Sequence, residues 1–436
     1  HQKLSIKSSK NIKKLIEGLL TRTLMKTKIR TQSLAKIFDL KLLGSVFFLI
    51  LISIYSIYSS HLNSETLIQF QKHLGYVALG LMITIVVTFT SENWIRSITF
   101  PFYIATIILL IAVLIFGVKI NGTVGWLKIG GYSLQPVELA KLAVILTSSA
   151  FLTIPGVSIK NIRGLGFLSV IFLIPVIFII LQPDFGSAII ILTLLWSILY
   201  WSDFNLNFLI AILALPFLVL FYLKGLVEFI LVVAIFCGII LFINKGKIIT
   251  SLLTTVIVVG LVFGIKDTIN HLHEHQQARI QAFVNPEFAP LKQSYNVIQS
   301  ILAVGSGGIV GKGPFSGTQT QLKYVYAQSS DFVFSIPAEE FGFIGSIAIL
   351  IAFTILITRV IKIGTETNSP FLRYIILSYG TLLFVHFVQN IGMAIGLLPV
   401  MGIPLPFVST GGSFFLVNSF LLGVVLNAYR KKFKSY

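Results

Sequence analysis

Twelve apolar stretches of roughly bilayer-spanning length dominate the sequence of 436 residues. A helix needs about 20 mainly apolar residues to cross the hydrocarbon core. The stretches cover residues 42–60, 74–90, 98–118, 134–153, 165–182, 185–202, 206–223, 226–243, 248–265, 332–359, 371–396 and 406–429. We therefore predict an all-α protein, a polytopic transmembrane helical bundle with about 10–12 spans.

Composition excludes the main soluble classes of protein. Only 11% of the residues are charged and 56% are hydrophobic, whereas a soluble domain carries about 25% charged residues. Such a chain cannot build a water-exposed surface, which excludes a soluble enzyme and a nucleic-acid-binding module. The single cysteine, Cys237, lies in an apolar stretch, so neither a disulfide framework nor a thiolate metal site is expected.

The net charge of +18 is concentrated at the two ends of the chain. Residues 1–41 hold eleven Lys or Arg and two acids, and basic residues also cluster at the C-terminus. Basic segments that flank apolar spans mark the cytoplasmic face. We predict a basic cytoplasmic N-terminal segment (1–41), a membrane domain (42–430) and a basic cytoplasmic tail (431–436). The first span is expected to be an anchor, not a cleaved signal, and since the sequence opens on His1, Met25 is a candidate natural start.

An even number of spans returns the C-terminus to the cytoplasmic side. The short loops on that side carry Arg96, Lys160, Arg163, Lys245, Lys247, Arg359, Lys362 and Arg373, which agrees with the orientation rule. The external segments are then 119–133, 182–184, 266–331 and 397–408. Segment 266–331 is longer than an ordinary connection, and its glycines and aromatic residues predict an ordered loop pressed against the helices.

Five acidic residues in or at the ends of the apolar stretches are singled out as candidates. They are Glu138, Asp184, Asp331, Glu339 and Glu340. A charge at the bilayer centre costs about 2.5–3.5 kcal/mol on insertion scales, so such residues usually face a cavity or a partner. Each is therefore a functional candidate, with structural pairing as the alternative.

Glu138 and Lys141 are three residues apart and share one face of a helix. They either neutralise each other or form a charged cavity wall in which Lys141 faces an anionic group. Asp184 follows Gln182 and Pro183 at a helix start, where capping of backbone N–H groups is the structural alternative to a functional role.

Asp331 ends a polar run and opens a span from the external side. A carboxylate at the mouth of an apolar cavity is what a general base for an alcohol requires, and a helix N-cap is an equally supported reading. Glu339 and Glu340 follow about two turns later and point about 100° apart. At most one of them shares the face of Asp331, and the other is expected to meet a lysine or to stay protonated.

Two further groups of polar residues give weaker evidence for a functional site. His386, Gln389 and Asn390 are expected to form hydrogen bonds between helices. Alternating histidines in the predicted external segment have no secure strand or carboxylate partner, so solvation is favoured over a metal site; these are His271, His273 and His275.

Five segments, in order, resemble the SEDS family (shape, elongation, division and sporulation), most closely its RodA branch. The resemblance spans nearly the whole chain. Its segments are 125-GWLKIGGYSLQPVELAK-141, 182-QPDFGSA-188, 279-RIQAFVNPE-287, residues 295–346 and residues 390–413. Within them, 317-GTQTQ-321 favours the RodA branch over the division paralogue.

The resemblance implies a peptidoglycan glycosyltransferase that polymerises lipid II, a disaccharide-pentapeptide on undecaprenyl pyrophosphate, for cell elongation and shape. Asp331 matches the family's essential Asp, the expected general base. Lys141 and Arg279 match basic positions able to hold the pyrophosphate. The positions that match cavity or support residues are Glu138, Asp184, Trp126 and Gln182.

The resemblance also implies a class B penicillin-binding protein as a transpeptidase partner. The expected location is the bacterial inner (cytoplasmic) membrane, with both termini cytoplasmic and the active site facing the extracytoplasmic side. A divalent cation, Mg²⁺ or Mn²⁺, is electrostatically compatible with the pyrophosphate, but the sequence has no dedicated ligand cluster, so no cofactor or metal site is assigned.

The chain departs from the family pattern in three ways. The usual Pro-Glu-x-His-Thr-Asp reads Tyr-Ala-Gln-Ser-Ser-Asp at 326–331, and the usual Tyr-Gly-Gly-Ser reads Thr-Gly-Gly-Ser at 410–413. The family core has ten spans, so an extra pair within 206–265 resembles an insertion. None of these departures removes Asp331.

Two alternative functions remain open at the level of sequence. A lipid II flippase would use the same cavity and charges without needing an external base, although transporters commonly show repeated halves and none is apparent here. A non-catalytic scaffold for a penicillin-binding protein would tolerate the change Asp331→Asn.

Overall fold

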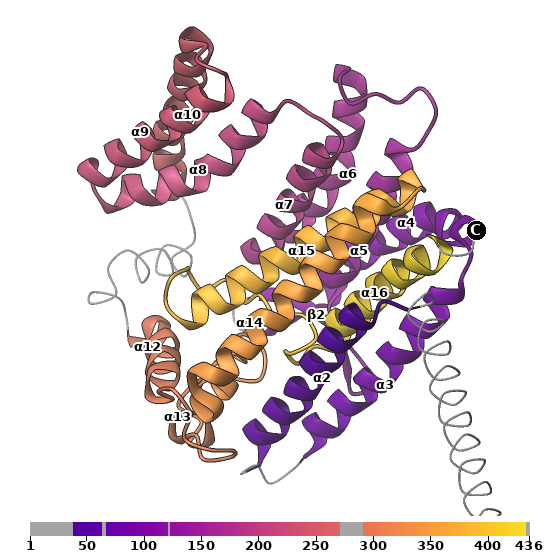
Figure 1. Cartoon of the computed structure of the whole chain (residues 1–436), viewed down its shortest axis with the longest axis vertical. Helices are drawn as coiled ribbons and strands as arrows, with labels where there is room; N and C mark the ends of the chain where they lie inside the picture. Colours follow the sequence, from indigo (N-terminus) through magenta and orange to yellow (C-terminus); the bar gives the residue numbers. More distant parts are fainter. Residues whose placement is uncertain (1–37, 63–66, 121–122, 271–290, 433–436) are drawn as a thin grey trace, which may run out of the picture.

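The computed structural model describes residues 38–62, 67–120, 123–270 and 291–432. Across these ranges every predicted span coincides with one helix (Figure 1). The helices are α2 (Leu40–His61), α3 (Ile68–Phe89), α4 (Glu92–Phe116), α5 (Pro136–Leu152), α6 (Ile162–Leu181), α7 (Phe185–Trp201), α8 (Leu206–Lys224), α9 (Leu226–Ile243), α10 (Ile248–Asn270), α14 (Ser335–Glu366), α15 (Pro370–Ala394) and α16 (Gly412–Lys432). The predicted helical bundle is confirmed, with boundaries that shift by several residues.

Eight of the described helices are long and apolar enough to cross a membrane. They are α2, α3, α4, α6, α9, α14, α15 and α16. Helices α5 and α7 have 17 residues each, and the apolar parts of α8 and α10 are shorter than their helices. Large apolar side chains such as Phe100, Ile108 and Ile115 are exposed on α4, as a lipid-facing surface requires. The protein is a multi-pass membrane protein.

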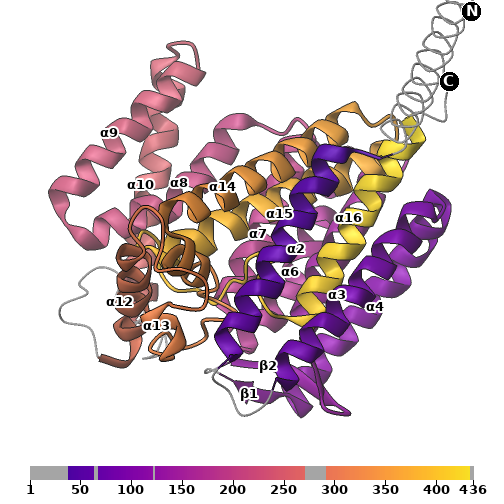
Figure 2. The same ribbon diagram turned by 60° about the horizontal axis from the view of Figure 1, so that its bottom comes forward.

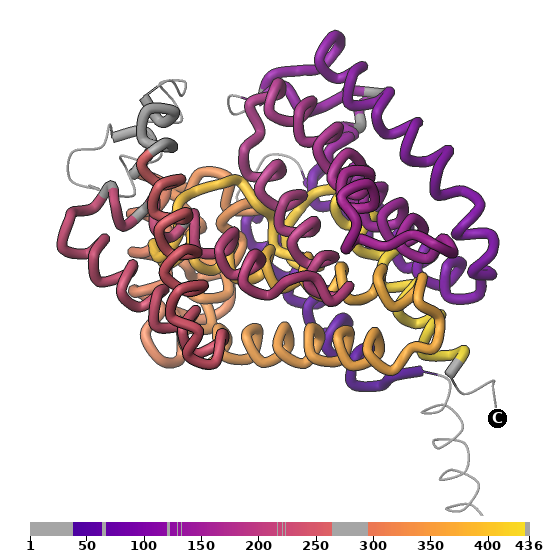
Figure 3. Tube along the Cα trace, turned by 90° about the horizontal axis from the view of Figure 1, so that it is seen from above, coloured from indigo at the N-terminus to yellow at the C-terminus, as the bar shows by residue number. Residues whose placement is uncertain are grey.

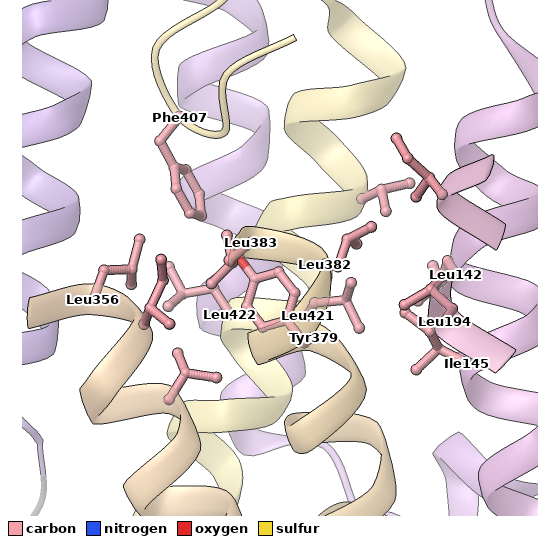
Figure 4. Close-up of a cluster of buried hydrophobic side chains, with 14 of the residues drawn as sticks. Leu142, Ile145, Leu194, Leu356, Tyr379, Leu382, Leu383, Phe407, Leu421 and Leu422 are labelled. Atoms are coloured by element: carbon pink, nitrogen blue, oxygen red, sulfur yellow. The ribbon is translucent and has the colours of Figure 1, made fainter. Parts of the chain in front are cut away.

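The main core lies between α5, α7, α14, α15 and α16 (Figure 4). Tyr379 and Leu383 of α15 are enclosed there together with Leu356 of α14 and Leu421 of α16. Because lipid tails are as apolar as leucine, close packing drives the association of membrane helices. Gly80 of α3 illustrates this, since a Cβ there would lie 2.5 Å from the hydroxyl oxygen of a serine on α16.

Helices α8, α9 and α10 form a separate group beside the main bundle (Figures 1 and 3). They have a small apolar core of their own, in which Leu218 of α8 packs near Phe229 of α9 and Val262 of α10. The extra pair of spans expected within 206–265 therefore falls on a group that is packed mostly against itself.

The predicted external segments meet at one end of the bundle, which Figure 2 shows opposite the C-terminal end of α16. Segment 119–133 adds a small antiparallel sheet that the sequence did not predict. Its strands are β1 (Val118–Ile120), β2 (Thr123–Ile129) and β3 (Tyr132–Leu134), in the order β1-β2-β3. The sheet pairs Val118 with Trp126, and Leu127 with Leu134.

At the opposite end of the bundle, ion pairs join different helices to each other. Asp39 caps α2 and receives a hydrogen bond from Arg359 Nε of α14 at 2.7 Å. Glu92, in the first turn of α4, lies 3.3 Å from the amine of Lys431 at the end of α16. These two pairs join the start of α2 to α14 and the start of α4 to the end of α16.

The described part of the long external segment is ordered against the bundle, as predicted. It forms helix α12 (Leu291–Ser306) and the short helix α13 (Thr318–Gln321), and α12 packs on α14 and α15. The remainder of the segment, 271–290, lies outside the described residues.

A glycine interrupts helix α14, and the glycine-rich run that follows α12 packs against this interruption. Gly342 has φ 62° and ψ −152° inside α14. The N–H of Phe343, just beyond the break, donates to Gly308 O at 2.9 Å, and Gly311 lies so close that a Cβ on Gly342 would be 2.4 Å from its nitrogen. Because backbone groups at membrane depth need partners inside the protein, the break and run 305–313 depend on each other.

Replacing Gly342 with alanine is expected to lower the stability of the protein by about 3 kcal/mol or more. The backbone conformation there is essentially restricted to glycine, and the new Cβ would overlap backbone atoms. Thermal unfolding of the purified protein in detergent measures the effect. Gly44→Ala in α2 is the matched control, since a Cβ at Gly44 meets nothing within 4 Å; similar losses in the two variants would contradict the assignment.

Candidate functional site

A cavity of about 300 Å³ opens at the end of the bundle where the predicted external segments converge. Its wall is formed by β2 and β3, the start of α5, the corner 183–185, the turn that carries Asp331, and the loop between α15 and α16. Three residues singled out from sequence line it together: Trp126, Asp184 and Asp331. The fold thus brings side chains separated by about two hundred positions to one cavity.

Asp331 lies in a turn before α14, not at the helix N-cap. Helix α14 begins at Ser335, and its N-cap, Phe334, makes no side-chain capping bond. The backbone N–H of Asp331 donates to Ala327 O at 3.1 Å, and its carboxylate oxygen Oδ2 lies 3.6 Å from the Cβ position of Gly402, which also lines the cavity. The capping interpretation of Asp331 is therefore wrong.

The turn is held in place by side chains that sequence reasoning did not assign to the site. Asn390 of α15 donates from Nδ2 to Asp331 O and to Ile403 O, each at 2.8 Å. Thr410 donates to Ser329 O through both its backbone N–H and its hydroxyl, each at 2.9 Å. Hydrogen bonding by Asn390 was predicted, but its acceptors are carbonyls of the turn and the loop.

Asp184 has two roles at once. As N-cap of α7 it accepts hydrogen bonds from Ser187 N at 3.1 Å and from Ser187 Oγ at 2.8 Å. The predicted capping is confirmed, and because Asp184 also lines the cavity, the same carboxylate contributes negative charge beside that of Asp331.

Gln182 supports the cavity from behind. Its side chain is fully buried and donates from Nε2 to Leu110 O of α4 at 3.3 Å, and its backbone carbonyl accepts from Val124 N of β2 at 3.3 Å. It therefore joins the corner before α7 to α4 and to the sheet, and it does not line the cavity itself.

Glu138 and Lys141 form a buried ion pair on α5. The Lys141 amine lies 2.8 Å from Glu138 Oε1, and both side chains are almost inaccessible to solvent. Lys141 also lies 5.8 Å from the ring centre of Phe414, a residue that lines the cavity. Of the two sequence interpretations, mutual neutralisation is the one that this geometry matches, and Lys141 is not among the residues that line the cavity.

Of the two remaining acidic candidates, Glu339 binds the segment that precedes α14 and Glu340 binds α2. Glu339 lies 2.7 Å from the amine of Lys312 and accepts from Thr320 N at 3.0 Å. Glu340 accepts from Ser59 Oγ at 2.7 Å and from the hydroxyl of Tyr55. The expectation that one of them meets a lysine is confirmed, and neither lines the cavity.

Several sequence-based candidates cannot be located. Arg279, His271, His273 and His275 lie outside the described residues. Among the residues that the structure describes, no group of three potential metal-ligating side chains occurs, and the cavity wall contains no Lys, Arg or His.

Most of the chain is similar to one protein family. It matches the FtsW/RodA/SpoVE family, described as cell cycle protein, over residues 32–230 and 210–434. Among its relatives, the peptidoglycan glycosyltransferase MrdB of Escherichia coli is 30% identical over 359 residues, 82% of this chain and 85% of the relative. The peptidoglycan glycosyltransferase RodA of Treponema pallidum is 27% identical over 406 residues, 86% of this chain and 94% of the relative.

Solved structures share the fold at lower identity. The rod shape determining protein RodA of Thermus thermophilus has a TM-score of 0.58 and 22% identity, covering 89% of this chain and 96% of that one. A chain from a peptidoglycan synthase complex that coordinates polymerization and crosslinking has a TM-score of 0.66 and 22% identity, covering 90% of this chain and 97% of that one.

Removing one member of the Glu138–Lys141 pair should destabilise the protein more than removing both. Lys141→Met leaves an unpaired buried carboxylate, which costs about 3–5 kcal/mol, whereas apolar replacement of a whole buried pair is often nearly neutral. Thermal unfolding of Lys141→Met and of the double variant Glu138→Leu/Lys141→Met tests this. Equal destabilisation of the two variants would show that the pairing is not the important interaction.

Proposed function

The chain belongs to the FtsW/RodA/SpoVE family, and on that basis we propose that it is a peptidoglycan glycosyltransferase that polymerises lipid II into β-1,4 glycan strands. The observation that carries the proposal is the carboxylate of Asp331 in the wall of a cavity at the end of the bundle. The relatives named above are peptidoglycan glycosyltransferases.

Asp331 is the general base in this proposal. Its carboxylate takes the proton from the 4-hydroxyl of the acceptor GlcNAc, whose oxygen attacks C1 of the donor MurNAc. The C1–oxygen bond to undecaprenyl pyrophosphate breaks in the same displacement, and the pyrophosphate carries away the electron pair. A single displacement inverts the α-linked donor to a β-1,4 product, so one base suffices and no covalent enzyme intermediate forms.

The hydrogen bonds around the turn support this role for Asp331. A base must keep its distance to the proton it removes, and a misplacement of about 1 Å can cost a hundredfold in rate. Asn390 and Thr410 bind the backbone of the turn on both sides of the side chain, which limits its movement.

The other matched residues have supporting roles in the proposal. Trp126 and Asp184 contact the substrate in the cavity, and Gln182 supports them. We assign the pyrophosphate to Arg279, since a guanidinium can bind two oxygens at once. Glu138 and Lys141 match family positions as well, and in this proposal their buried ion pair supports the cavity wall next to Phe414.

The cellular setting follows from the same proposal. Basic segments 1–41 and 431–436 lie in the cytoplasm, the cavity faces the extracytoplasmic side of the bacterial inner membrane, and the product serves cell elongation and shape. A class B penicillin-binding protein supplies the transpeptidase that crosslinks the strands. The similarity to a chain of a peptidoglycan synthase complex supports such a partner.

Transport of lipid II and a purely scaffolding role are the competing functions. A flippase needs a path across the bilayer, whereas the cavity described here is lined by segments from one end of the bundle. A scaffold does not need a carboxylate in a cavity. Both competing functions therefore predict tolerance of an isosteric change at Asp331.

Asp331→Asn should abolish glycan synthesis while the protein stays folded. The amide has nearly the shape of the carboxylate but cannot accept the proton, and loss of a general base typically costs about 10²–10⁴-fold in rate. Purified protein with its partner and labelled lipid II gives the measurement, with polymer length resolved on a gel.

The matched control is Asp203→Asn, the same chemical change at the opposite end of α7 from Asp184. Asp203 is exposed, so polymer should form at the wild-type rate. Equal polymer from wild type and Asp331→Asn would refute the assigned base, and lipid II translocation without polymer from the wild type would favour transport.

A further inference from the structure

A second groove lies on the other side of the turn that carries Asp331. It has a volume of about 340 Å³ and is lined by the end of α2, by Gln69 of α3 and by residues between 323 and 329. Residues 325–329 of the turn line this groove, while Ser330 and Asp331 line the cavity described above. One short segment thus separates two hollows.

The groove has a fixed polar wall. His61 Nε2, at the end of α2, is 2.8 Å from Gln69 Oε1 near the start of α3, which joins the two helix ends. Gln328 is only 7% exposed, and its Nε2 makes a long contact of 3.5 Å with Ser60 O. Its Oε1 is buried with no hydrogen-bond partner among the described residues.

An unpaired amide oxygen in the wall indicates the kind of ligand that the groove would take. Gln328 lines the groove, and rotation of its amide would bring Oε1 to a ligand N–H, which removes the cost of a buried acceptor without a partner. Lys323 is exposed in the same wall and supplies a positive charge. Amide N–H groups together with a carboxylate are the chemistry of a peptide, and not that of a hydrocarbon chain.

Distances along the chain allow one molecule to reach both hollows. Ser329 and Asp331 are two residues apart, so their Cα atoms are separated by at most about 7 Å. An extended pentapeptide spans up to about 17 Å. A sugar beside Asp331 can therefore carry a peptide that passes the turn into the groove.

We propose that this groove is a second substrate subsite, which binds the carboxylate-bearing peptide of a lipid-linked muropeptide while its sugar occupies the cavity beside Asp331. The proposal rests on the proposed function for the identity of the substrate. In it, Lys323 binds a peptide carboxylate and Gln328 accepts a peptide N–H.

Equilibrium binding tests the subsite without requiring turnover. The full chain in detergent is titrated with lipid II and with the same lipid-linked disaccharide lacking the peptide. Lys323→Gln and Gln328→Met are each expected to weaken binding of lipid II about threefold to tenfold. Binding of the peptide-free ligand should not change, because the altered side chains contact only the peptide.

Lys128→Gln is the matched control. Lys128 is exposed on β2 at the same end of the bundle and lines neither hollow, so the variant loses the same charge without touching the groove and should bind both ligands as the wild type does. The subsite proposal is wrong if the two groove variants bind lipid II normally, if they lose affinity for both ligands equally, or if the control loses as much.

Polymerisation by the wild type is recorded separately. Peptide-selective binding without polymer would overturn the proposed function and leave the subsite supported. Polymer formation, together with equal losses of binding for both ligands, would support the proposed function and overturn the subsite.

Discussion

Backbone hydrogen bonding at the end of the bundle that carries the cavity is the constraint on which the rest of this structure depends. Non-helical backbone is tolerated in a membrane protein only where the protein satisfies its polar groups. Here the break at Gly342 is satisfied by Gly308, and the turn before α14 is satisfied by Asn390 and Thr410. These bonds allow an irregular segment, and with it a carboxylate, to stand at the edge of an apolar bundle.

Buried charges in the bundle divide into two kinds. Glu138 is paired with Lys141, and Glu339 with Lys312, each at hydrogen-bond distance; these pairs reduce the cost of burying charge and fix neighbouring segments. Asp331 lines a cavity that opens to solvent, whereas Glu138 and Glu339 do not line it. A proton acceptor has to be reachable by its substrate, and of these three acids Asp331 meets that condition.

The same turn has two faces, and this gives the site its shape. One face carries Asp331 into the cavity, and the other contributes Gln328 to a separate polar groove. Because the turn is bound through its carbonyls to the loop between α15 and α16, the two hollows keep a fixed spacing. A substrate with a sugar and a peptide has two chemically different parts that such an arrangement can bind separately.

The sequence by itself determined the helical membrane class and the twelve apolar helices, because span length is a local property of the chain. It also identified Asp331 and Asp184 as candidates, since acids are rare in apolar stretches. Only the tertiary structure decided that Lys141 is paired with Glu138, that Asp331 is not the N-cap of α14, and that Asn390 binds the carbonyl of Asp331. Those outcomes depend on which helices pack together and on where carbonyls from distant parts of the chain lie. The spacing of residues along the sequence predicts neither of these.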